Sequence, residues 1–156
     1  MDRLRRAAIR LALAEQPSEE LPMLAAEALA AGVDSPALRE LAGLSRSDAS
    51  QDLFVQAMAE LGFPIPDQQD AWRRLMLWEA EALLDGTRQP YQAGHEIYWS
   101  ACHLERSPHI ESVIVEFLGL WSTWEDRPAD RETTERAMHE AAARLLAHHH
   151  PLRDGP

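Results

Sequence analysis

The stretch that decides the fold runs from residue 107 to residue 125 and reads SPHIESVIVEFLGLWSTWE. Ser107 and Pro108 are typical of a helix start, because a serine hydroxyl caps a free backbone N–H and proline needs no donor in the first turn. From residue 113 to residue 124, Glu116 is the one charged side chain in a mostly apolar run. A helix that is apolar on most sides usually lies at the centre of a protein. We therefore expect residues 108–125 to form the central helix.

The same helical pattern recurs on both sides of this stretch. Apolar residues return at three- and four-residue spacing, and Ser-Pro, Asp-Gly and Gly-Phe-Pro breaks separate the runs. The predicted helices span residues 2–15, 19–31, 36–42, 49–61, 68–85, 90–105, 108–125 and 129–147. No alternating strand pattern and no internal repeat occur. The sequence thus predicts an all-α protein, a compact bundle of seven to eight helices, with one domain over residues 1–147 and a flexible tail over residues 148–156.

The balance of charges is acidic and narrows the choice of partner. The chain has 156 residues and a formal net charge of −11. Such a surface repels nucleic-acid phosphate and anionic lipid, so we expect neither a nucleic acid nor a membrane as partner. A basic protein partner would be attracted, although plain solubility explains the charge as well. The first ten residues are an exception, with four arginines and one aspartate; they could lie against the acidic remainder or against a partner chain.

Cysteine content and apolar runs predict a cytoplasmic protein. Cys102 is the only cysteine, which excludes an internal disulfide and is consistent with a reducing compartment. Arg10 interrupts the first apolar stretch, which leaves it too short for a secretory leader. No run of eighteen apolar residues exists to span a membrane. All fifteen basic residues are arginine, and neither lysine nor asparagine occurs, as is typical of a GC-rich bacterial genome.

Motifs for metal or cofactor binding are incomplete. His95-Glu96 begins a zinc-protease pattern, but Trp99 occupies the position that needs a second histidine. His95 and Cys102 would share a helix face about 10 Å apart along its axis, too far for one ion. The Glu-x-x-His spacing of di-iron bundles is absent. We therefore expect no metal and no cofactor.

The candidate pocket residues are Glu116, His95, His103 and Trp99. Glu116 has apolar helical neighbours, and a buried carboxylate is often functional; it could instead lie on a narrow exposed strip or pair with an arginine. All five tryptophans lie between residues 72 and 124. They could pack in the core, line a pocket for a flat ligand, or form an exposed binding surface.

Three segments carry a resemblance to known proteins. Residues 21–28 (LPMLAAEA), 34–43 (DSPALRELAG) and 85–97 (DGTRQPYQAGHEI) resemble an uncharacterised family of small helical proteins of high-GC Gram-positive bacteria. These motifs are helix starts and stops, so the resemblance implies a helical fold. It implies no activity, because none is established for that family, and it assigns no site residue.

No set of residues converges on a catalytic motif. A phosphate-cradling glycine loop, a nucleophile elbow and a paired Cys-x-x-Cys are all missing. The preferred hypothesis is a non-enzymatic, acidic protein-binding protein of the inhibitor, immunity or accessory type. The alternative is an enzyme or small-molecule binder that uses an aromatic pocket around the fifth to seventh helices. A homodimer that buries part of the tryptophan-rich face is a third possibility.

Overall fold

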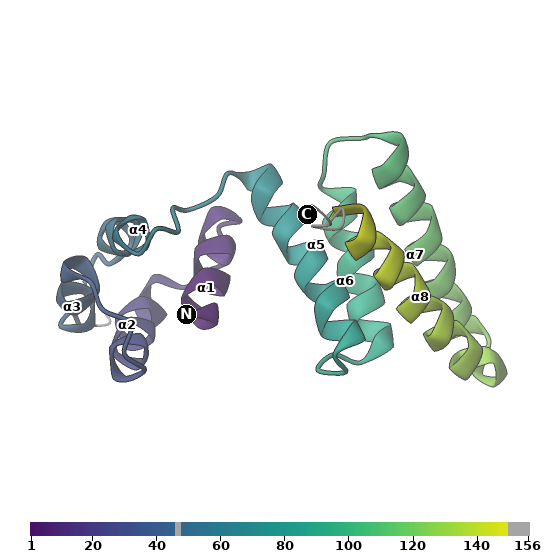
Figure 1. The fold of residues 1–156 in the computed structure, drawn as a ribbon, viewed down its shortest axis with the longest axis horizontal. Helices are drawn as coiled ribbons and strands as arrows, with labels where there is room; N and C mark the ends of the chain where they lie inside the picture. The colour runs from purple at the N-terminus through teal and green to yellow at the C-terminus, as the bar shows by residue number, and fades with distance from the viewer. Residues whose placement is uncertain (46–47, 150–156) are drawn as a thin grey trace, which may run out of the picture. The chain divides into compact units, whose positions relative to one another are not determined.

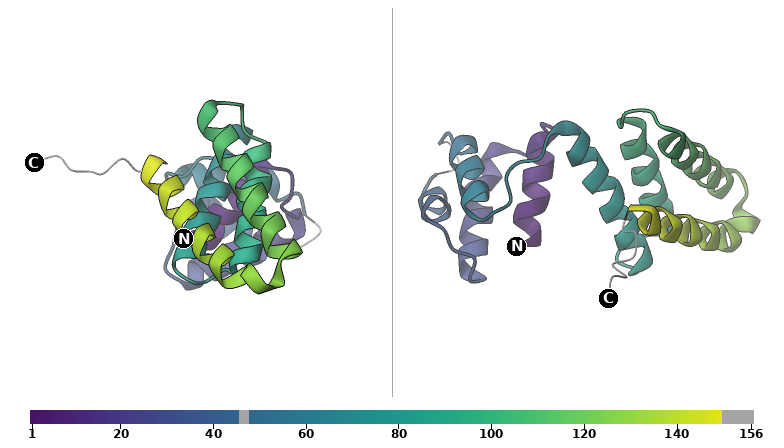
Figure 2. Two further views of the ribbon diagram at one scale, coloured as in Figure 1. Left: turned by 90° about the vertical axis from the view of Figure 1, so that its right-hand side faces the viewer. Right: turned by 45° about the horizontal axis from the view of Figure 1, so that its top comes forward.

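The computed structural model describes residues 1–45 and 48–149, and within them all regular structure is helical (Figures 1 and 2). The α-helices are α1 (Asp2–Ala12), α2 (Leu21–Ala30), α3 (Pro36–Ala42), α4 (Gln51–Glu60), α5 (Gln68–Leu84), α6 (Pro90–Cys102), α7 (Pro108–Asp126) and α8 (Arg131–His149). Two short 3₁₀ helices, η1 (Ser18–Glu20) and η2 (Pro128–Asp130), precede α2 and α8. The prediction of an all-α fold is confirmed. Across the described ranges, none of these helices combines the length and apolar character needed to cross a membrane.

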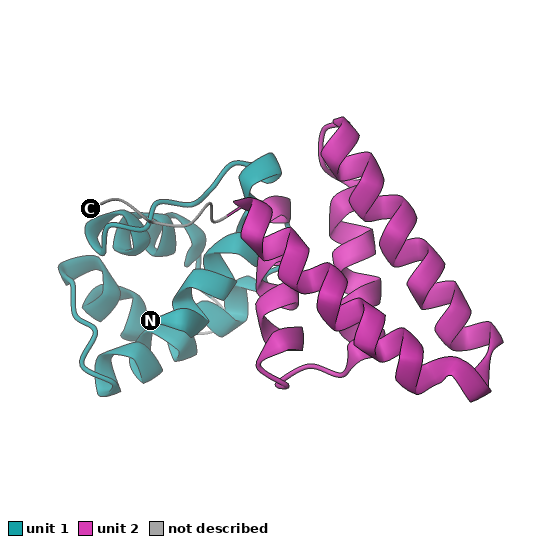
Figure 3. Cartoon of the chain, turned by 45° about the vertical axis from the view of Figure 1, so that its right-hand side comes forward, with its two compact units in different colours: residues 1–71 teal, residues 72–156 magenta. Residues whose placement is uncertain are grey.

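The chain divides into two compact units, residues 1–71 and 72–156 (Figure 3). The division falls inside α5, whose first four residues belong to unit 1 and whose remainder belongs to unit 2. Each unit has buried apolar residues of its own. A single domain over residues 1–147 stays a prediction.

Helix starts and ends follow the breaks that the sequence indicates. The Oγ atoms of Ser35 and Ser107 each accept a hydrogen bond of 3.2 Å from a first-turn backbone N–H. Gly32 ends α2 with a φ of +84°, a left-handed conformation that costs glycine little because it has no Cβ. Gly32 therefore supplies the left-handed residue that follows the C-terminal end of α2.

Three helix boundaries differ from the prediction. Helix α1 ends at Ala12 because the chain turns at Ala14, which has a φ of +57°. Helix α6 ends at Cys102, where His103 closes the last turn with a three-residue hydrogen bond to the carbonyl of Ser100. Helix α8 starts after η2 and continues to His149. The first two residues of the predicted tail are thus helical, and residues 150–156 lie outside the described residues.

Unit 1 encloses a core between α1, α2, α3 and α4. Its buried members are Leu4, Ala7, Ala8, Leu21, Ala25, Ala28, Ala37, Leu38, Leu41, Phe54, Ala57 and Met58. Phe63 and Ile65, from the proline-rich connector before α5, pack against this core. The arginine-rich helix α1 also lies against α2, where Arg3 forms an ion pair with Glu27. Of the two placements predicted for this basic segment, the structure shows the one against the acidic remainder.

Unit 2 consists of the larger part of α5 together with α6, α7 and α8. Helix α6 packs against α7 and α8, and α7 also packs against α8. Gly94 of α6 permits a close approach: a Cβ atom there would lie 3.3 Å from Sδ of Met138 and 3.9 Å from Cδ1 of Phe117. A larger residue at position 94 would therefore press on the side chains of α7 and α8.

Helix α7 holds a central place in unit 2 without being covered on all sides. It contacts both α6 and α8, and it buries Ile110, Val113 and Phe117 on one stripe. Val115 and Leu118 face solvent on another side, with 71% and 38% of their surface exposed. Apolar content therefore overstates the burial of this helix, because only the stripe between its two neighbours is covered.

Candidate functional site

Two of the predicted pocket residues, Trp99 and His103, lie side by side at the end of α6. Their ring centroids are 5.0 Å apart, and Nδ1 of His103 lies 2.8 Å from the carbonyl oxygen of Trp99. The His103 ring also stacks on Trp72 of α5, at 4.2 Å and 18°. Trp72 is buried, whereas 48% of Trp99 is exposed. The tryptophans thus divide between core and surface.

His95 lies one turn earlier on α6 and faces α7. Its ring meets Trp121 edge-on, with 5.0 Å between centroids. Tyr91, His95 and Trp121 line a shallow cavity together with Arg88, Gln92 and Glu96. On the same helix, half-buried Cys102 forms a hydrogen bond with Tyr98, and this contact raises the pKa of the tyrosine.

Glu116 lies apart from these aromatic residues, on the side of α7 that faces α8. Its Oε1 accepts a hydrogen bond of 2.6 Å from Nη2 of Arg144. Both partners are partly exposed, so the carboxylate is neither buried nor unpaired. Of the alternatives predicted for Glu116, pairing with an arginine is confirmed. The four predicted residues therefore lie in three separate places.

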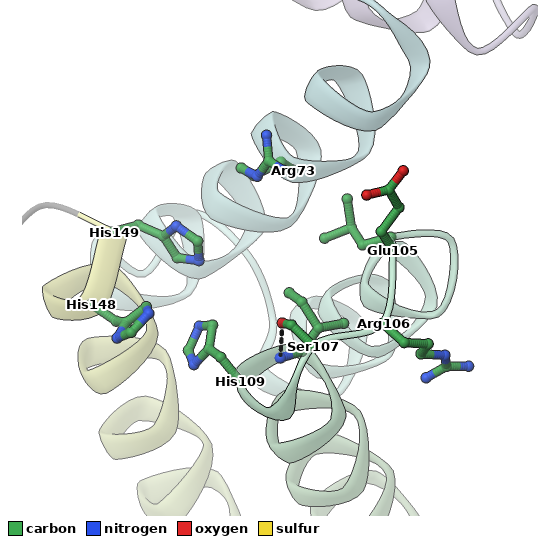
Figure 4. Close-up of a pocket in the computed structure, with 9 residues that line it drawn as sticks. Arg73, Glu105, Arg106, Ser107, His109, His148 and His149 are labelled. Carbon is green, nitrogen blue, oxygen red and sulfur yellow. Dashed lines mark hydrogen bonds between the residues drawn. The ribbon is translucent and has the colours of Figure 1, made fainter.

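A different group of side chains surrounds a cavity of about 350 Å³ in unit 2, here called the histidine cavity (Figure 4). Its lining residues are Arg73, Leu104, Glu105, Arg106, Ser107, His109, Ile110, His148 and His149. They come from α5, from the loop between α6 and α7, from the first turn of α7 and from the last turn of α8. Figure 4 shows the three imidazoles grouped on one side, while Arg106 points away from them.

The hairpin of α7 and α8 brings these histidines together. The two helices run antiparallel through η2, so the start of α7 meets the end of α8. The rings of His109 and His148 stack at 3.7 Å and 25°, and the His149 ring lies 5.3 Å from His109. Nε2 of His109 is buried and has no hydrogen-bond partner among the described residues. Desolvation lowers the pKa of His109, and the nearby His148 lowers it further.

Sequence reasoning missed this cluster because it assigned the last histidines to a tail. A signal was present: one histidine starts the seventh helix and others end the eighth, and a short connection makes these two helices antiparallel. Within residues 1–45 and 48–149, no group of three or more histidine, cysteine, aspartate or glutamate side chains is placed to hold a metal ion.

Unit 1 has a second candidate surface, here called the methionine groove. It consists of two adjoining shallow cavities between α1 and α2, of about 340 and 330 Å³. Its lining residues are Met1, Asp2, Arg3, Leu4, Glu19, Glu20, Met23, Leu24, Glu27, Ala28 and Ala31. Met23 lines one of the two cavities and is 52% exposed. The groove thus joins an apolar floor to an acidic rim.

Comparison with known proteins gives no relative from which a function can be carried over. No family model matches the chain, and neither a curated protein nor a solved structure matches it.

Proposed function

We propose that the chain is a protein-binding protein whose methionine groove takes a positively charged, amphipathic helix of another protein. The observation that carries this proposal is Met23, whose side chain is half exposed with Glu19 and Glu27 one helical turn away on either side. The binding class is that of an inhibitor, an immunity-type partner or an accessory subunit. No catalytic step is part of it.

The apolar part of the groove supports a helical occupant. Met23 and Leu24 are adjacent on α2, and Leu24 is only partly buried against the core of unit 1. Methionine is flexible and polarisable, so methionine-lined surfaces adapt to different apolar side chains. Amphipathic helices bind such grooves through apolar residues spaced at one face.

The charges around the groove support a basic occupant. Residues 15–60 contain nine acidic residues and two arginines. Among the side chains that line the groove, Arg3 is the one cation, and it already pairs with Glu27. Glu19 lies beside it at the surface, and Glu20 accepts a hydrogen bond from Gln16. Complementary charge of this kind speeds association and selects among partners.

The proposal is tested with a fluorescently labelled amphipathic peptide of leucine and lysine, titrated with the full chain and followed by anisotropy. A peptide with glutamate in place of every lysine serves as the charge control. We expect the lysine peptide to bind, with an affinity that falls as salt is added. Met23→Gln should weaken binding by about fivefold or more, which corresponds to about 1 kcal/mol.

Matched variants distinguish binding at the groove from non-specific attraction to an acidic protein. Val55→Gln removes an exposed apolar side chain of α4, which lies outside the groove, and should leave the affinity unchanged. Glu19→Gln should weaken binding more than Glu132→Gln, although the net charge changes equally. Equal effects of Met23→Gln and Val55→Gln, or equal binding of the glutamate peptide, would show that the groove is not the binding site.

The aromatic cavity of unit 2 supports the second candidate, a small-molecule binder. Tyr91, His95 and Trp121 offer ring faces and edges to a flat ligand, and Glu96 and Arg88 supply polar groups beside them. Trp121→Phe would then reduce ligand-induced quenching of tryptophan fluorescence. The groove is preferred because its exposed methionine and acidic rim together define one class of partner.

A further inference from the structure

We propose that the histidine cavity of unit 2 binds a small oxyanion, a phosphate or a carboxylate group, together with protons on its imidazoles. This inference is independent of the methionine groove, which lies in unit 1. It starts from an imbalance of charge. Among the described residues, Arg73 and three histidines line the cavity together with Arg106, whose side chain points away from the imidazoles, and Glu105 is the one carboxylate.

This accumulation of basic groups is unusual for the chain. The formal net charge is −11. No more than one arginine lines either cavity of the methionine groove, the aromatic cavity, or a cavity of about 250 Å³ between α7 and α8 that His109 also lines. Like charges at short range repel, so a basic cluster is stabilised when an anion occupies the space between its members. The cavity, at about 350 Å³, has room for an oxyanion and water.

The geometry of the imidazoles favours an anion over a metal ion. A bound zinc ion lies about 2.0–2.1 Å from a ring nitrogen, and close to the plane of that ring. The rings of His109 and His148 are stacked 3.7 Å apart and only 25° from parallel, so their planes do not meet near both rings. Stacked rings can instead point their N–H groups side by side, toward separate oxygens of one anion.

Protonation and anion binding are coupled at His109. A protonated imidazole carries N–H donors at both nitrogens, and Nε2 of His109 is buried with no acceptor among the described residues. An oxyanion in the cavity would stabilise the charge of the protonated ring. The charged and titratable groups that line the two cavities beside His109 are Arg73, Glu105, Arg106, Glu116, Arg144, His148 and His149.

Inorganic sulfate is the probe, because it keeps both negative charges between about pH 5.5 and about pH 8, on either side of the ordinary histidine pKa. Any change in sulfate affinity with pH must then come from protonation of groups on the protein. We expect calorimetric titration of the full chain to show binding at least about fivefold tighter at the lower pH. By the same linkage, sulfate should raise the pKa of His109, measured from its ring C–H resonances.

Two variants and one control test which histidines cause the pH dependence of sulfate binding. His109→Gln and His148→Gln should each abolish the pH dependence of sulfate binding. His139→Gln should not, because His139 lies on α8 outside the cavity and its Nδ1 is 2.8 Å from the carbonyl oxygen of Glu135. Circular dichroism confirms that each variant keeps its helical content. Inorganic phosphate and acetate, titrated in parallel, distinguish a phosphoryl from a carboxylate ligand.

Three results would overturn the proposal. The first is sulfate binding of equal strength at both pH values. The second is an unchanged pH dependence in His109→Gln. The third is a larger shift of the histidine resonances with zinc than with any oxyanion, which would assign the cavity to a metal.

Discussion

Glu116 and Phe117 are neighbours in the sequence, but their side chains contribute differently to the stability of the fold. Glu116 forms a partly exposed ion pair with Arg144, whereas the Phe117 side chain is fully buried. An exposed pair contributes little because water and salt screen it. Glu116→Gln should therefore change the free energy of unfolding by less than about 1 kcal/mol, measured by urea denaturation. Phe117→Ala, which empties a buried site, should cost about 3–5 kcal/mol; comparable losses would mean that Glu116 does more than pair with Arg144.

His109 should make folding sensitive to acid. Its pKa in the folded protein lies below the ordinary value of 6.5, first because burial disfavours the charged ring and then because His148 is close. The unfolded chain therefore takes up the proton more readily as the pH falls through this range, and stability is lost. Above the ordinary histidine pKa, His109 is neutral in both the folded and the unfolded chain, and no stability is lost in this way.

The measurement is the free energy of unfolding between about pH 7.5 and about pH 5.5, a range centred on the ordinary histidine pKa, in buffer without oxyanions. We expect the unmodified chain to lose more stability over this range than His109→Gln, which cannot take up a proton. Parallel curves for the two proteins would show that His109 does not titrate differently on folding.

At the scale of a helix, the start of α7 depends on Ser107. Its Oγ accepts from the backbone N–H of Ile110, which otherwise has no partner within the helix. Ser107→Ala should cost about 1 kcal/mol of stability, in urea or thermal unfolding. Ser112→Ala is the matched control, since Ser112 is exposed in the interior of the same helix, and it should cost less. An equal loss of stability in both variants would show that Ser107 does not stabilise α7 as a cap.

Helix positions could be predicted from sequence because their signals are local. The serine caps, the proline at each following position and Gly32 act on the backbone within one turn, so α2, α3 and α7 begin or end close to where they were expected. The exposed side of α7 could not be predicted in this way. Val115 and Leu118 are as apolar as Val113, and only the positions of α6 and α8 decide which of them is covered.

Which side chains meet in a candidate site depends even more on long-range packing. Local spacing indicated Glu116 and His95, but it could not show that Arg144 would reach the carboxylate from α8. The contact of His109 with His148 joins residues thirty-nine positions apart, through a hairpin whose register no local motif encodes. The residue types therefore indicated which side chains could act in a site, but not which of them would lie close together.

Across the whole molecule, the two units provide separate cores that can be tested separately. All five tryptophans lie in unit 2, so their fluorescence reports on that unit alone, whereas far-ultraviolet circular dichroism reports on helices of both. Phe54 is fully buried in the core of unit 1. Phe54→Ala should destabilise unit 1 by about 3–5 kcal/mol and leave the midpoint of the fluorescence transition unchanged.

Non-coincident transitions from the two probes would establish independent unfolding of the units. Phe117→Ala is the reciprocal variant, and it should shift the fluorescence midpoint because Phe117 is buried in unit 2. A single shared midpoint that moves equally in both variants would instead support the predicted single domain, with α5 coupling its two halves.

The position of Cys102 has a practical consequence for all of these measurements. It is the only thiol in the sequence, and it lies half-buried at the last residue of α6. A maleimide dye would attach at that one place, without mutation of any other residue. The native chain can therefore carry a single reporter in unit 2, next in sequence to His103 and three residues from Trp99.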